Sequence, residues 1–187
     1  LETALASVQR PERSASFHRL RSKALPEAVP VESTSRNAPE TVLILIDLGQ
    51  GRQRLGGSVF AQTQGVFGGD PPDLDAPDQL VMLLDSLQRA RAANLVLSYH
   101  DRSDGGLIAC LCEMAFASRC GLTINLDLLT VDPHSSDWGD FKIRPEQVAV
   151  QREEASLRAL FAEELGVVVQ VARSRRSEFM DILRQTG

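Results

Sequence analysis

The segment HDRSDGGL, residues 100–107, places a histidine, a serine, two aspartates and two glycines within eight positions. A short apolar run precedes it and a largely apolar helical pattern follows it. A turn from a strand into a helix leaves backbone N–H groups unpaired at the positive end of the helix dipole. Glycines let a phosphate approach such donors closely, and an aspartate there can hold Mg²⁺ that bridges phosphate oxygens. The segment therefore indicates a site for a magnesium-bound phosphate.

A second segment of the same kind is RLGGS, residues 54–58, which also lies between a predicted strand and a predicted helix. We call residues 54–58 the first joint and residues 100–107 the second joint. A purely structural role stays open at both. Asp104 could serve only as a helix cap, Gly105 and Gly106 only as turn residues, and His100 only as a structural histidine.

Several other catalytic patterns are excluded. The chain contains neither the phosphate-loop pattern G-x₄-G-K-[ST] nor the dinucleotide pattern G-x-G-x-x-G, and it has no G-x-S-x-G elbow. The near-adjacent Ser103, His100 and Asp101 do not favour a hydrolase triad, whose members must converge in space. The three cysteines, Cys110, Cys112 and Cys120, have no second ligand pair for zinc and are best interpreted as small buried thiols.

Hydrophobic periodicity predicts alternating strands and helices from residue 41 onward. Leu80, Leu83, Leu84 and Leu87 follow the spacing of one helical face, and Asn94 suits the end of that helix. The predicted strands are 41–49, 95–99, 122–129 and 166–172; the predicted helices are 58–64, 78–94, 107–120, 153–165 and one capped by Ser174. Helices packed on a sheet follow from this order, with an α+β fold competing with an α/β fold.

Residues 1–40 are rich in Ser, Arg, Glu and Pro, and short helical pieces are conceivable near residues 1–8 and 17–25. We predict a poorly ordered tail or linker, or a segment added to the natural chain, followed by one domain over residues 41–187. The polar stretch 130–147 is expected to be an inserted loop. Because the chain does not start with Met, we expect it to be part of a longer polypeptide.

Composition limits the partners. The net charge is −5, so no basic field favours nucleic acid or an anionic membrane. No apolar run approaches the ~20 residues of a membrane span, and the first residues lack the pattern of a signal peptide. Three cysteines within eleven positions do not suggest a disulfide framework, so we expect a reducing, cytoplasmic location.

Four blocks resemble the large, single-chain phosphoribosylformylglycinamidine synthases of purine biosynthesis. These blocks are LILIDLGQGRQRLGGSVFAQ, GGDPPDLDAPDQL, YHDRSDGGLIACLCEMAFASRCGL and LFAEELGVVVQV, and the resemblance covers roughly residues 41–187. It is most specific at HDRSDGGL, which points to the second of two C-terminal halves that are similar to aminoimidazole-ribonucleotide synthetase. The resemblance implies an α+β fold with a mixed sheet flanked by helices.

The same resemblance implies an activity and a site. The full enzyme would use ATP and glutamine to convert formylglycinamide ribonucleotide to its amidine, as an amidoligase, with ATP activating the formyl amide oxygen. This chain alone would be inactive and would contribute half of an auxiliary Mg²⁺–ATP/ADP phosphate site. The residues implied are Gly56, Gly57, Ser58, His100, Asp101, Ser103, Asp104, Gly105 and Gly106, with Asp101 as the Mg²⁺ ligand and no role for Arg102.

The implied partners are the N-terminal synthetase-like half and the glutaminase domain of the same full-length protein. A homodimer is expected when the chain is isolated, because the surface that meets the other half is then exposed. Two alternatives stay open: a non-catalytic structural or interaction module, and a relative of the same superfamily that acts on another substrate.

Overall fold

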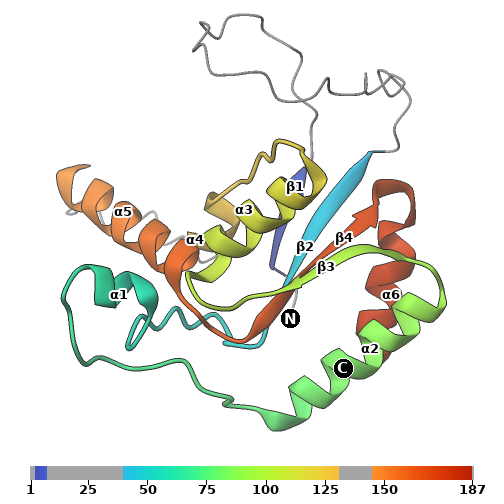
Figure 1. Ribbon diagram of the computed structural model, residues 1–187, viewed down its shortest axis with the longest axis horizontal. Helices are drawn as coiled ribbons and strands as arrows, with labels where there is room; N and C mark the ends of the chain where they lie inside the picture. Colours follow the sequence, from blue (N-terminus) through green and yellow to red (C-terminus); the bar gives the residue numbers. More distant parts are fainter. Residues whose placement is uncertain (1–2, 8–39, 131–144, 187) are drawn as a thin grey trace, which may run out of the picture.

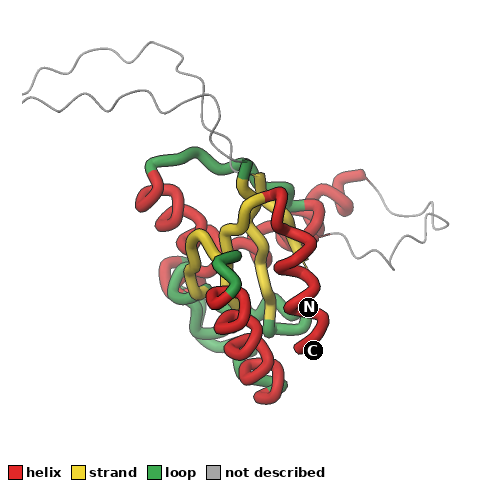
Figure 2. The backbone as a smooth tube through the Cα atoms, turned by 90° about the vertical axis from the view of Figure 1, so that its right-hand side faces the viewer, coloured by secondary structure: helices red, strands yellow, loops and turns green. Residues whose placement is uncertain are grey.

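The computed structural model describes residues 3–7, 40–130 and 145–186. Within these ranges the chain forms a four-stranded sheet with helices on both faces (Figures 1 and 2). The strands are β1 (Thr3–Ser7), β2 (Thr41–Asp47), β3 (Val96–Asp101) and β4 (Gly166–Ala172). The helices are α1 (Val59–Thr63), α2 (Pro77–Ala92), α3 (Gly106–Ser118), α4 (Asp127–Thr130), α5 (Pro145–Phe161) and α6 (Arg176–Thr186), the last preceded by a 3₁₀ turn at Arg173–Arg175.

The sheet has the order β1-β2-β4-β3, and each neighbouring pair is antiparallel. The aliphatic runs of β2 and β4 are buried almost throughout, because helices cover both faces of these central strands. Both β2 and β3 run opposite to β4, with Asp47 paired to Gly166 and Asp101 paired to Val167. The ends of β2 and β3 therefore lie together at the end of the sheet where β4 begins.

Two apolar cores lie on opposite faces of the sheet. Helices α2 and α6 cover one face, where Phe179 and Leu83 pack against the alternate side chains of β2 and β4. Helix α3 covers the other face through Leu107, Cys110 and Met114, and α5 packs alongside it. The result is a three-layer arrangement of helix, sheet and helix.

The α+β class is confirmed, with the sheet flanked by helices. In detail, every pairing between the described strands is antiparallel, whereas the resemblance implied a mixed sheet. None of the helices among the described residues combines the length and the apolar content that a membrane span needs.

Several predicted elements are corrected. The alternating leucines of residues 122–129 do not form a strand; Leu122, Ile124 and Leu129 instead pack from a loop and from α4 against the core beneath α3. Ser174 lies inside the 3₁₀ turn rather than at a helix cap. Helix α3 ends with Arg119 in the left-handed region, at φ +53°, two residues before Gly121.

The N-terminal region differs in part from its prediction. Residues 3–7 form the edge strand β1 and not a helix, and they pair with β2. Residues 8–39, including the helical piece considered near 17–25, lie outside the described residues, as do residues 131–144 of the expected insertion. The last residues of that stretch begin α5.

Phe179→Ala should lower the free energy of unfolding by roughly 3–5 kcal/mol, because it leaves a cavity in the core between α6 and the sheet. The Phe179 side chain is 0% exposed, whereas Phe116 on α3 is 75% exposed. The matched control Phe116→Ala should change stability by less than about 0.5 kcal/mol. Urea unfolding followed by circular dichroism measures both, and equal losses would contradict the assigned core.

Candidate functional site

The second joint begins inside β3, because the strand continues through His100 and Asp101. The chain then turns, and α3 starts after Gly105, which has φ +84°. Asp101, Ser103 and Asp104 are exposed at this turn. The exposed side chains of the turn can therefore contact a ligand from outside.

The first joint connects β2 to α1, and its serine has a structural role. Ser58 is the N-cap of α1: its hydroxyl accepts a hydrogen bond from the Ala61 amide at 3.1 Å and donates one to the Leu55 carbonyl at 2.7 Å. The residue is fully buried. Because both hydrogen bonds are internal, the Ser58 side chain fixes the backbone of the joint and does not face solvent.

The two joints meet at one carboxylate. The Oε1 atom of Glu163 accepts a hydrogen bond of 2.8 Å from the Gly105 amide of the second joint. The same atom accepts one of 2.8 Å from the Val59 amide, which directly follows the first joint. The two amide nitrogens thus lie within two hydrogen-bond lengths of each other and aim at a common point. That point already holds an anionic oxygen.

The neighbouring Glu164 holds the first joint in place. Its carboxylate is fully buried and forms a bidentate pair with Arg54, at 2.7 Å on each oxygen, while Oε1 also accepts the Arg54 amide at 2.9 Å. Arg54 reaches Asp75 as well. These hydrogen bonds, chiefly those with Glu164, raise the pKa of the Arg54 guanidinium. The joint is therefore anchored through its own arginine.

Arg102 has a clear role, although the resemblance assigned it none. Its buried guanidinium donates to the Asp47 carboxylate, to the Glu164 carbonyl and, at 3.0 Å, to the Leu165 carbonyl. It therefore ties the end of β3 to the end of β2 and to the turn before β4. Arg54, Arg102, Glu163 and Glu164 were missed as site residues. All four lie in blocks that carried the resemblance, but no local pattern within those blocks marks them as part of the site.

The glycines of the joints divide into packed and open positions. A Cβ at Gly56 would meet the Asp70 backbone at 2.5 Å, and one at Gly106 would meet the Leu160 carbonyl oxygen at 2.7 Å. Gly57 has φ +74° and open space where a Cβ would be, and it is exposed. Gly56 and Gly106 thus permit close packing of the chain on itself, whereas the backbone at Gly57 is accessible to a ligand.

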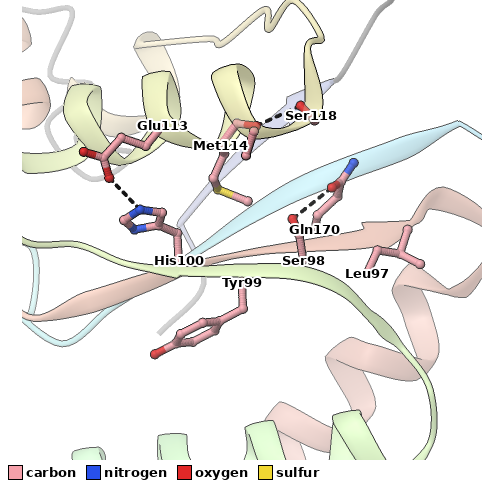
Figure 3. Close-up of a pocket in the computed structure, with 9 residues that line it drawn as sticks. Leu97, Ser98, Tyr99, His100, Glu113, Met114, Ser118 and Gln170 are labelled. Carbon is pink, nitrogen blue, oxygen red and sulfur yellow. Dashed lines mark hydrogen bonds and ion pairs between the residues drawn. The ribbon is translucent and has the colours of Figure 1, made fainter. Parts of the chain in front are cut away.

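His100 points from β3 toward α3 (Figure 3). Its Nδ1 lies 2.7 Å from the Asp101 carbonyl oxygen and its Nε2 lies 2.7 Å from a Glu113 carboxylate oxygen. Both partners are acceptors, so both ring nitrogens donate only when the ring is a cation. The backbone carbonyl of Asp101 and then Glu113 raise the pKa of His100. The contacts of its ring with Asp101 and Glu113 fix its orientation at the end of β3. The residue also faces a groove of about 540 Å³ between β3 and α3.

The donor set fits a Mg²⁺ ion that is held mainly by a ligand's phosphates. No group of three or more His, Cys, Asp or Glu side chains that could hold a metal exists among the described residues. Asp101 and Asp104 are exposed carboxylates at the joint. Mg²⁺ commonly takes only one or two protein carboxylates and completes its octahedron with phosphate oxygens and water.

Two further features lie near the site: a buried cysteine thiol and a cavity. Burial raises the pKa of the Cys110 thiol to about 12, which makes it a poor nucleophile. A cavity of about 670 Å³ lies beside the first joint, lined in part by Arg54, Gly56, Phe60 and Arg158. This cavity gives the first joint a concave surface next to the exposed Gly57.

The raised pKa of His100 predicts a pH-dependent contribution to stability. The protonated ring is favoured in the folded state, so its stabilising effect is complete below the unfolded pKa of about 6.5 and is lost as pH rises through the folded pKa. In an NMR titration, the ring should titrate above 6.5, and Glu113→Gln should lower that midpoint. Glu178→Gln on the distant α6 should leave it unchanged. A wild-type midpoint at or below 6.5 would contradict the hydrogen bonds assigned to the protonated ring.

Comparison with known protein families shows which family the chain belongs to. The sequence matches the family described as AIR synthase related protein, C-terminal domain, over residues 38–187. The match includes β2, both joints, and the turn that carries Glu163 and Glu164. Proteins of this superfamily are ATP-using synthetases and ligases that typically use ATP with Mg²⁺. The chain therefore belongs to the AIR synthase related C-terminal domain family and is a nucleotide-binding type of synthetase-superfamily domain.

Proposed function

We propose that this chain forms the phosphate-facing half of a Mg²⁺–nucleotide site in phosphoribosylformylglycinamidine synthase, as its second synthetase-like C-terminal half. The observation that carries the proposal is the convergence of the Val59 and Gly105 amides on one anionic oxygen. A pair of donors that already binds a carboxylate oxygen can also bind a phosphate oxygen. Both donors come from the two segments that the family resemblance identifies.

The chain's own contribution is binding and orientation. The two amides hold one phosphate oxygen and the open backbone at Gly57 lets the phosphate approach, while the exposed carboxylates of Asp101 and Asp104 would hold the associated Mg²⁺. ATP or ADP bound here would have an auxiliary role, while the phosphoryl group that activates the formyl amide oxygen is transferred at the other synthetase-like copy. Binding by the isolated chain is weak, because an N-terminal synthetase-like half supplies the other contacts. A glutaminase domain supplies the ammonia.

A specific set of observations favours a second candidate, a structural or interaction module. Ser58 is internally bonded, Gly56 and Gly106 are packed against backbone, and both amides are already satisfied by Glu163. In that case the joints would only hold the end of the sheet together. A superfamily relative with another substrate would share the phosphate site and differ in the group that is activated.

A pair of glycine variants separates ligand binding from folding. Gly57→Ala and Gly65→Ala each place a Cβ in open space at a positive φ, +74° and +66°, so each should lose roughly 1–2 kcal/mol of stability. Only Gly57 lies at the joint. Gly57→Ala should therefore weaken MgADP binding by about tenfold, or 1.4 kcal/mol, while Gly65→Ala leaves it unchanged. Amide chemical shifts followed during a titration measure the affinity.

Two outcomes of that titration would count against the phosphate site. Equal affinity in both variants would favour the structural module. Submicromolar binding by the wild-type chain would contradict the proposal that it holds only half of the contacts.

Domain exchange tests the substrate. In a chimera, this chain replaces the second C-terminal half of a phosphoribosylformylglycinamidine synthase. The chimera should retain at least about a tenth of the ADP formation that depends on formylglycinamide ribonucleotide. The reason is that the joints of this chain would meet the N-terminal half as the native ones do. A chimera with Gly57→Ala should lose most of that activity. A folded chimera that binds MgADP and yet shows no such activity would favour another substrate.

A further inference from the structure

The Glu163 carboxylate is held differently from its neighbour Glu164. Glu164 is fully buried and paired with Arg54. Glu163 is only partly buried, and none of the ion pairs between described residues includes it. Among the described residues, its carboxylate accepts hydrogen bonds from the amides of Val59 and Gly105, and the bond to Val59 is exposed to solvent. Such a carboxylate can be replaced by an incoming anion without leaving a buried cation unpaired.

The bonds of Glu163 are also not ordinary helix capping. A cap residue normally precedes the helix that it caps, and α1 already has its cap in Ser58. Glu163 instead reaches across the fold, 104 positions along the chain from Val59 and 58 from Gly105. One oxygen bridges two separate segments, which is the arrangement that a bound oxyanion would adopt between them.

We infer that Glu163 is an internal oxyanion that occupies the phosphate donors of the two joints and is displaced when a phosphate ligand binds. The inference rests on the proposed phosphate site and assigns its regulation to one residue. A phosphate and the carboxylate compete for the same two N–H groups, and the negative charge of Glu163 also repels an approaching anion. The unliganded site is thus held closed by the chain itself, and the two joints keep their spacing in the absence of ligand.

The experiment compares Glu163→Gln and Glu163→Ala with the wild-type chain of 187 residues. Glutamine keeps an acceptor oxygen for the two amides and removes the charge; alanine removes both. The probes are inorganic pyrophosphate, an anion without a base or sugar, and MgADP. Affinity is measured from amide chemical shifts, with those of Val59 and Gly105 as the local reporters.

Glu163→Gln should bind pyrophosphate about tenfold more tightly than the wild type, and Glu163→Ala more tightly still. The control is Glu153→Gln, which removes the same charge from an exposed position of α5 and should leave the affinity unchanged. The shifts of the Val59 and Gly105 amides should move on ligand addition in the wild type, because their acceptor changes. Thermal melts establish that each variant is folded, and the glutamine variant suffices if the alanine variant is not.

Each other outcome overturns the inference in a distinguishable way. Wild-type binding with unchanged or weaker affinity in Glu163→Gln would show that Glu163 positions the joints and does not compete, while the proposed phosphate site would stand. An equal gain in pyrophosphate affinity in Glu153→Gln would show that the change in net charge, and not the position of Glu163, causes the effect. No binding of either probe by the wild type or by any variant would overturn the phosphate site and this inference together.

Discussion

The structure depends on a short turn between α5 and β4, where two adjacent glutamates face in different directions. Glu164 is buried against Arg54, and Glu163 accepts the amides of Val59 and Gly105. Arg102 reaches the carbonyls of the same turn from the end of β3. Removal of one partner from a buried ion pair leaves an uncompensated charge. The pair Arg54–Glu164 therefore fixes the position of the first joint relative to the turn before β4.

Sheet topology explains why one turn can serve both joints. Strand β4 lies between β2 and β3 and runs opposite to each, so the chain enters β4 where the other two strands end. The helix that follows each joint lies near the same corner of the sheet (Figure 1). The meeting of two loops that are distant in sequence is therefore a direct consequence of antiparallel pairing. The phosphate site proposed there needs no dedicated binding loop of the phosphate-loop kind.

Anchoring and accessibility are separated within each joint. Ser58, Gly56 and Gly106 face the interior and fix the backbone, whereas Gly57, Asp101 and Asp104 remain exposed. Rigid backbone donors lose little freedom when a ligand binds, which is how a small number of amides can contribute usefully. In this structure both donors are engaged by one internal acceptor, the Oε1 atom of Glu163.

The sequence by itself determined the strands β2, β3 and β4, the long helices and both joints, whereas it left α+β and α/β open and only the family resemblance implied α+β. The strands, helices and joints follow from local rules: β-branched runs at strands, apolar side chains at helical spacing, and glycine between a strand and a helix. Residues 122–129 obey the strand rule but form only a single bridge at Thr123, while Leu122 and Ile124 pack against the core beneath α3. Only the tertiary structure decided that Glu163, Glu164 and Arg102 belong to the site. Their partners lie about 60 to 110 positions away in the chain, and an acidic pair or a lone arginine has no local pattern that distinguishes an anchor from a solvated surface charge.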